Sequence, residues 1–213
     1  MDKAKAILNT ADFVKGKLKK EGSGHDWFHI ERVWNLARSI SKEEDANGFV
    51  CEMAALLHDL IDDKITQDIQ QSRSEMVQWL NDQEVNEFDI DHILHIIDHM
   101  SFSSGGKVST IEGKVVQDAD RLDAIGAIGI ARCFQYSGFK EQLIYDPEIQ
   151  VREKLTKESY RNEPSTAINH FYEKLLKLKE LMNTDTGKKL AEGRHEFMER
   201  YLEQFSFEWE GEK

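Results

Sequence analysis

The sequence has little cysteine and little proline, and each shortage excludes a class of protein. Two cysteines and two prolines occur among 213 residues. Two cysteines cannot supply the disulfide framework of a small secreted domain, so we predict that Cys51 and Cys133 are buried thiols in a reducing cytoplasm. The scarcity of proline, with 39% apolar and 32% charged residues, favours amphipathic helices with solvated outer faces over buried parallel strands.

Long apolar runs and an excess of basic residues are also missing. No apolar run approaches the roughly 20 residues that cross a bilayer, and the N-terminal segment MDKAKAILNTADFVKGKLKK lacks the apolar region of a signal peptide. We therefore expect a cytoplasmic protein without membrane contact. The formal net charge of -12 argues against a nucleic-acid partner, because such a surface needs a basic stripe. Any phosphate-bearing ligand must be held locally.

Apolar residues recur at helical spacing along most of the chain. Helices are predicted at residues 4–18, 26–47, 49–57, 68–81, 84–100, 111–136, 164–178 and 185–205. Residues 137–162 are polar and poorly periodic, which predicts an irregular segment. No repeat or linker divides the sequence, and its length suffices to bury one core. We therefore predict a single all-α domain over residues 1–213.

A cluster of histidine and aspartate interrupts the most apolar of these helices. The segment AALLHDLIDD contains one histidine and three aspartates within six residues: His58, Asp59, Asp62 and Asp63. Burial of that set without partners would be costly. Adjacent imidazole and carboxylate groups are typical of a metal site. The alternative is a helix end that turns to solvent with acidic residues on it.

Two further clusters have the same character. The segment GHDWFHIERV places His25 and His29 four residues apart, so both can face one site, although a single histidine beside an apolar stripe is more often packed in a core. The segment VVQDADRLDAIGAIGIAR contains Asp118, Asp120 and Asp123. Asp118 and Asp120 point about 160° apart on a helix, which leaves one of them as a ligand. Asp120 and Asp123 share a face, which suits a ligand and a supporting partner. The small residues that follow predict close backbone packing.

The three clusters together resemble the HD-domain metal-dependent phosphohydrolase superfamily. The phrases GHDWFHI, LLHDLIDDK and VVQDADRLDAIGAIGIAR are most similar to its small single-domain bacterial branch. The resemblance covers residues 24–132 and implies a helical HD-domain fold, with C-terminal helices at 164–206 packed on this ligand core. It implies four metal ligands: His29, His58, Asp59 and Asp120. Asp120 is preferred to Asp118 because DADRLD aligns with the A-D-R-L phrase of stringent-response hydrolases, whose aspartate before Arg-Leu is the ligand.

Further roles follow for the surrounding residues. Asp62 and Asp63 fall where the stringent-response enzymes carry a Glu-Asp pair that handles the attacking water, and the exchange of glutamate for aspartate shortens the reach by one methylene. The segment SFSSGG at residues 101–106 offers backbone N–H groups and hydroxyls for a phosphate. We predict that five residues contact substrate: His25, His99, Lys107, Arg121 and Lys64.

Two imidazoles and two carboxylates make an octahedral site with two open positions. Such a site suits Mn²⁺, which we favour, or Fe²⁺, Co²⁺ or Ni²⁺, and suits Mg²⁺ less well. The resemblance implies hydrolysis of a nucleotide: either a nucleoside triphosphate that releases pyrophosphate, or a nucleoside monophosphate that loses its phosphate. The alternatives are a cyclic-nucleotide phosphodiesterase with a second metal at His95 and His99, and a non-catalytic nucleotide-binding module. Whether the chain forms a homodimer stays open.

Overall fold

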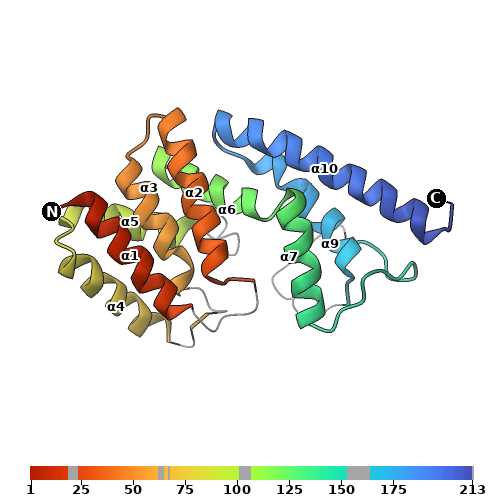
Figure 1. Cartoon of the computed structure of the whole chain (residues 1–213), viewed down its shortest axis with the longest axis horizontal. Coiled ribbons are helices and arrows are strands. Elements are labelled where there is room, and N and C mark those ends of the chain that lie inside the picture. Colours follow the sequence, from red (N-terminus) through yellow and green to blue (C-terminus); the bar gives the residue numbers. More distant parts are fainter. Residues whose placement is uncertain (19–23, 62–64, 67, 101–106, 153–163, 213) are drawn as a thin grey trace. The chain divides into compact units, whose positions relative to one another are not determined.

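The computed structural model describes residues 1–18, 24–61, 65–66, 68–100, 107–152 and 164–212. Every regular element among these residues is a helix, which confirms the all-α prediction (Figure 1). The chain divides into two compact units, Met1–Asp120 and Arg121–Lys213. A single domain over the whole chain therefore stays a prediction. Within the described residues, no helix combines the length and apolar character needed to cross a bilayer.

The first unit is built around its most apolar helix. In chain order it contains α1 (Lys3–Lys17), α2 (Trp27–Glu43), α3 (Gly48–Leu57), the 3-10 turn η1 (His58–Ile61), α4 (Ile69–Asp82), α5 (Glu87–Met100) and α6 (Ile111–Asp123) up to Asp120. Helix α3 packs against α1, α2 and α5. All its residues except Gly48 and Glu52 are buried, because its apolar side chains cover most of its circumference.

Capping residues fix where two helices of this unit begin. Asp26 precedes α2, and its Oδ1 accepts the backbone N–H of His29 at 2.9 Å. Asn47 precedes α3 in the same way and accepts from the N–H of Val50 at 3.5 Å. Such caps satisfy backbone donors that a helix start leaves open, and each contributes about 1 kcal/mol. They place His29 in the first turn of α2 and His58 directly after the last turn of α3.

The predicted helix at residues 111–136 is wrong as a single helix. Helix α6 ends at Asp123, and α7 (Gly126–Phe139) begins only after Ile125, whose φ of -127° and ψ of 165° are extended. Gly126 then has a φ of 76°, a left-handed conformation that glycine adopts without strain. The non-helical conformations of these two residues separate the helices.

The predicted helix at residues 164–178 is also divided. Helix α9 (Ala167–Glu173) ends at Lys174, whose φ of -137° is not helical, and the 3-10 turns η3 (Leu175–Lys177) and η4 (Lys179–Leu181) follow. Apolar residues on one face recur at nearly the same spacing in an α-helix and in a 3-10 helix. The spacing therefore did not reveal where the α-helix ends and the 3-10 turns begin.

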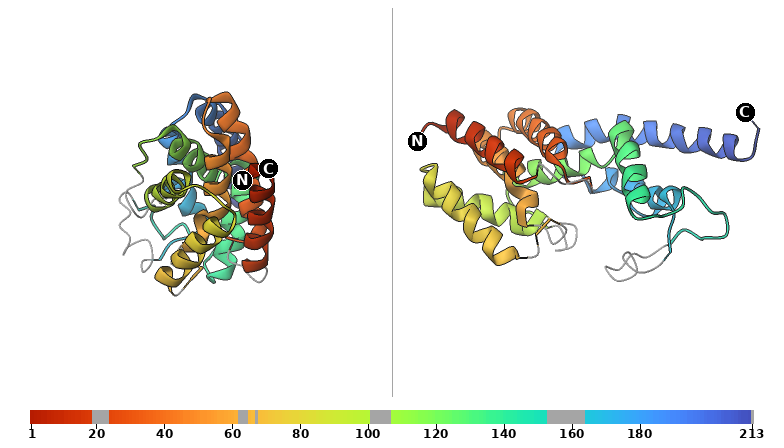
Figure 2. Two further views of the ribbon diagram at one scale, coloured as in Figure 1. Left: turned by 90° about the vertical axis from the view of Figure 1, so that its left-hand side faces the viewer. Right: turned by 60° about the horizontal axis from the view of Figure 1, so that its bottom comes forward.

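The second unit is arranged along the longest helix, α10 (Asp185–Trp209) (Figure 2). Helix α10 contacts α7 and η4, and α7 contacts α9. The irregular segment predicted at 137–162 is shorter than expected, because α7 continues to Phe139. Residues 140–152 contain no helix or strand, and residues 153–163 lie outside the described part.

Both cysteines are free and buried, as predicted. Burial raises the pKa of the Cys51 thiol far above its ordinary value and raises the pKa of Cys133 to about 12. Since the thiolate is the reactive form, both side chains behave as small apolar groups of the core.

Candidate metal centre

The four predicted ligands come from three elements of the first unit and converge at one point. His29 stands on α2, His58 and Asp59 on η1, and Asp120 on α6. His29 Nε2 lies 3.4 Å from Asp59 Oδ2 and 3.6 Å from Asp120 Oδ1. His58 Nε2 lies 3.2 Å from Asp59 Oδ1 and 3.9 Å from Asp120 Oδ1. Residues 91 positions apart in the sequence thus face a common centre.

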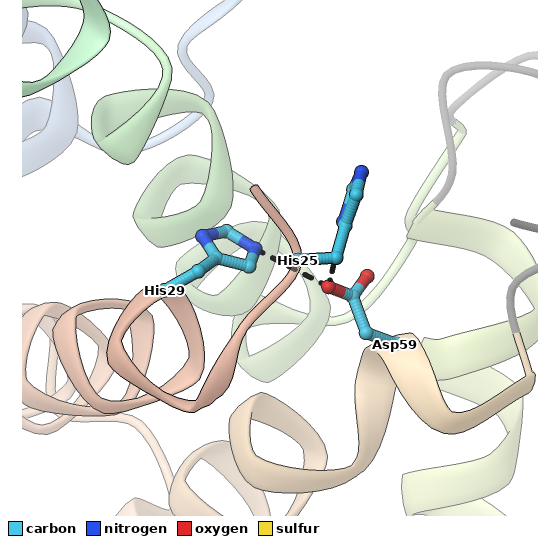
Figure 3. Close-up of side chains that lie close together, drawn as sticks. All are labelled: His25, His29 and Asp59. Atoms are coloured by element: carbon cyan, nitrogen blue, oxygen red, sulfur yellow. Dashed lines mark hydrogen bonds and ion pairs between the residues drawn. The ribbon is translucent and has the colours of Figure 1, made fainter. Parts of the chain in front are cut away.

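His25 lies against the same carboxylate. Its Nδ1 is 2.9 Å from Asp59 Oδ2, and its ring meets that of His29 edge-on with centroids 5.7 Å apart. Figure 3 shows both histidines directed at one oxygen of Asp59. The sequence predicts that His25 and His29 can face one site, and the structure brings them together although His25 precedes the helix. Its contact with Asp59 suits a residue that orients the carboxylate; a contact with substrate stays a prediction.

The hydrogen bond at the far side of the His58 ring determines what its near side can do. His58 Nδ1 lies 2.8 Å from the carbonyl oxygen of Ala55. A carbonyl only accepts hydrogen bonds, so Nδ1 carries the proton and a neutral ring has its lone pair on Nε2. That lone pair is buried and faces the carboxylates of Asp59 and Asp120. A lone pair that faces carboxylate oxygens is repelled by them, unless a cation lies between these acceptors and binds them all.

The charge of Asp59 is set by its burial and by its three histidine neighbours. Burial raises the pKa of this carboxyl, but its neighbours His58, His25 and His29 outweigh burial. The pKa therefore lies well below its ordinary value, and Asp59 is an anion. Its side chain is 7% exposed, whereas that of Asp120 is 40% exposed. The site is closed on the Asp59 side and open to solvent beside Asp120.

Two overlapping groups of side chains have donor atoms within 4.8 Å of one another. One contains His25, His29 and Asp59, and the other His29, His58 and Asp120. Imidazole nitrogen mixed with carboxylate oxygen is a donor set for first-row divalent metals. The residues present therefore fit a metal ion, and the oriented lone pair of His58 is the observation that supports it most directly.

The other predicted site residues have mixed positions. His99 is exposed on α5; its Nδ1 lies 2.8 Å from the carbonyl oxygen of His95, and the two rings lie 4.2 Å apart. Lys107 is exposed. The guanidinium of Arg121 donates to the carbonyl of Leu181 in the second unit. These contacts neither place the three side chains at the metal centre nor exclude them from it. Asp62, Asp63 and Lys64 lie outside the described residues.

Asp123 has a partner that the sequence pattern did not suggest. It is 1% exposed, and its Oδ2 accepts a hydrogen bond from Arg132 at 2.7 Å. The guanidinium of Arg194 donates to the carbonyl of Leu122. Arginines from α7 and α10 thus bind the carboxyl end of α6, the favourable position for cations. Asp123 binds at this junction, and no feature of the sequence indicated either arginine.

Comparison with known proteins assigns the class. The HD domain model matches residues 27–125. The uncharacterized Bacillus subtilis protein YpgQ is 43% identical over 208 residues, which cover 96% of this chain and 94% of YpgQ. The crystal structure of YpgQ in complex with ADP has a TM-score of 0.81 at 42% identity, over 98% of this chain and 97% of that one. An HD-superfamily hydrolase from Bacillus thuringiensis has a TM-score of 0.79 at 48% identity, over 98% of both chains.

The fold and the cluster define a helical protein with a histidine–aspartate site suited to a divalent metal. The chain belongs to the HD-domain family. The family assignment confirms the resemblance predicted from the three sequence phrases. An HD-superfamily hydrolase is among the structural neighbours of the chain.

Proposed function

We propose that the protein is a metal-dependent phosphohydrolase whose substrate is a nucleotide, with His29, His58, Asp59 and Asp120 as the metal ligands. The observation that carries the proposal is the His58 ring. Its Nδ1 is held by Ala55, and its Nε2 lone pair is directed at two carboxylates. The ADP bound in the YpgQ crystal structure supports the choice of a nucleotide. We favour a nucleoside triphosphate that releases pyrophosphate, or a nucleoside monophosphate that loses its phosphate.

A divalent ion, with Mn²⁺ favoured over Mg²⁺, would supply Lewis-acid polarisation of a phosphoryl oxygen and a more acidic water. The chain's own groups prepare the site for it. Ala55 fixes the tautomer of His58, and His25 orients the anionic carboxylate of Asp59. The side chain of Asp120 is 40% exposed, and we propose that the phosphate group approaches from this side. Asp62 and Asp63 are proposed to handle the proton of the attacking water.

A nucleotide panel with Mn²⁺ tests this function. The products are separated by ion exchange, which distinguishes pyrophosphate from orthophosphate release. We expect turnover by the wild-type chain and a loss of about a thousandfold in His58→Ala and Asp59→Ala, because a metal contributes several kcal/mol to transition-state stabilisation. Asp120→Asn should behave similarly.

His95→Gln is the matched control, because it removes an exposed histidine of α5. We expect it to retain full activity and one ion per chain. Loss of an ion in this variant would favour the two-metal phosphodiesterase. Wild-type turnover in His58→Ala, or binding of nucleotide without hydrolysis under any of the metals, would contradict the proposed hydrolase.

A further inference from the structure

The second unit contains a cavity with aromatic walls. Its volume is about 180 Å³, and it lies between the C-terminal end of α10, helix α9 and the segment that follows α7. Four of its lining residues are aromatic: Tyr145, Tyr172, Phe205 and Trp209. Trp209 and Tyr172 remain 48% and 41% exposed, so the walls are open to solvent. Large aromatic side chains left exposed around a hollow commonly mark a binding site.

The rings meet at right angles and form a corner. Tyr145 packs edge-on against Trp209, with centroids 4.9 Å apart and an interplanar angle of 82°, and edge-on against Phe205 at 6.0 Å and 88°. Phe205 and Trp209 are nearly parallel, at 23°. Burial and the neighbouring Tyr145 raise the pKa of Tyr172, which indicates that the two phenols lie close together. A ligand group in this corner would therefore contact more than one ring.

The described residues that line the cavity carry a net negative charge. Of the described residues that line it, one is acidic, Glu210, and none is basic. Glu210 is the C-cap of α10, a helix of 25 residues with no basic residue in its last turn. The negative end of the helix dipole there is thus not compensated from within the helix. Arg152, next to the lining residue Val151, is committed to Glu173, with Nε and Nη2 at 2.8 and 2.6 Å from its oxygens.

We propose that this cavity binds a small organic cation, specifically an alkylated ammonium group. Aromatic faces attract cations that lie within about 6 Å of the ring centroid, and Trp is the strongest of the three ring types. A cavity of about 150 Å³ holds a molecule the size of benzene, so the volume here suffices for a trimethylammonium group. A neutral apolar ligand would fit the walls equally well. Glu210 and the helix end distinguish the two, because they stabilise only the cation.

The test uses the full chain and two probes of the same shape. Choline carries the charge, and 3,3-dimethyl-1-butanol has carbon in place of its nitrogen. Binding is followed in every variant by titration calorimetry, and in the chains that keep Trp209 also by the NMR shift of its indole N–H, assigned with Trp209→Phe. We expect a saturable shift with choline and at least about threefold weaker binding of the alcohol, as a cation–π contact predicts. Trp209→Ala should weaken choline binding at least about fivefold, and Glu210→Gln about two- to threefold, with no effect of Glu210→Gln on the alcohol.

Phe197→Ala provides the matched variant, because Phe197 is an exposed aromatic residue of α10 that does not line the cavity. It should bind choline like the wild type. If Trp209→Ala does not fold, the proposal is tested by choline binding in Glu210→Gln alone, because Glu210 is exposed. Equal affinity for the two probes, no shift with either probe, or unchanged choline binding in Glu210→Gln would each overturn the proposal.

Discussion

His170, on α9, is expected to make the stability of the protein depend on pH. Burial and the positive charges of Lys174 and Arg152 lower the pKa of its imidazole to about 4, although Glu173 opposes them. The unfolded chain takes up this proton near the ordinary value of about 6.5, whereas the native state stays neutral. The free energy of unfolding therefore falls as pH drops from 6.5 to 4, by roughly 2–3 kcal/mol from this residue. Urea unfolding at several pH values, with wild type and His170→Gln, measures it.

The exposed His99 supplies the comparison for this measurement. His99→Gln should retain the wild-type slope, while His170→Gln should be flatter between pH 6.5 and 4.5. Hydrogen bonds and the charge of Arg152 outweigh burial and lower the pKa of Glu173, so its contribution is lost only below its ordinary value of 4.5 and does not enter this window. Parallel curves for wild type and His170→Gln would show that this imidazole is not responsible.

The candidate metal ligands could be predicted from the sequence because their chemistry conflicts with their surroundings. His58 and Asp59 end an apolar helix, and such a pair is costly unless it has a partner. The orientation of the His58 ring could not be predicted from the sequence. Its partner is the backbone carbonyl oxygen of Ala55, and every residue has such an oxygen. Alignment with a short phrase selected Asp120, and its Oδ1 lies within 4 Å of both Nε2 atoms. Its role as a ligand stays a prediction.

Helix boundaries show the limit of periodicity as a signal. The spacing of apolar residues predicts helix on both sides of residues 124–125 and does not reveal the break between the two helices. The small residues of this segment predict close backbone packing, and the close approach occurs within the junction itself. A side chain on Gly129 would lie 2.5 Å from the carbonyl carbon of Ala124 and nearer still to its oxygen.

Gly129 of α7 and Gly193 of α10 should respond oppositely to alanine. At Gly129 the added methyl would meet the backbone of Ala124, which cannot move aside without displacing the start of α7. We expect Gly129→Ala to lower the free energy of unfolding by about 1–3 kcal/mol, as overpacking does. Gly193 has nothing within 4 Å of its added carbon, so Gly193→Ala should raise that free energy by about 0.5–1 kcal/mol through helix propensity. Urea denaturation measures both, and a shift of the same sign in the two variants would contradict this account of the junction.

At the scale of the whole molecule, the sequence indicates the fold class but not the division of the chain. Low proline, high charge and helical periodicity predict an all-α protein, because they concern local structure. The boundary at Asp120 and Arg121 falls inside α6, where no change of composition marks it. What distinguishes the two units is which residues pack together over long sequence separations. The arginines that bind the end of α6 come from residues 132 and 194 and illustrate such contacts.

A bound divalent ion should stabilise the protein as a whole through the first unit. All four proposed ligands lie in Met1–Asp120. An ion that binds only the native state adds about 2.7 kcal/mol at a free concentration 100 times its Kd. For a chain of this length that corresponds to a rise in Tm of about 5–10 °C. Calorimetry of wild type in Mn²⁺ and after chelation measures the shift, which should vanish in His58→Ala and persist in His95→Gln.

This experiment depends on the difference between the Tm in Mn²⁺ and the Tm after chelation, and not on the absolute Tm. Replacing Asp59 by asparagine removes the anion that its histidine neighbours stabilise and should lower the Tm of the metal-free protein. The same replacement should abolish the response to Mn²⁺. A metal-free Tm of Asp59→Asn equal to or above that of wild type would contradict this account of the carboxylate. A wild-type Tm that is identical with and without Mn²⁺ would contradict the metal centre itself.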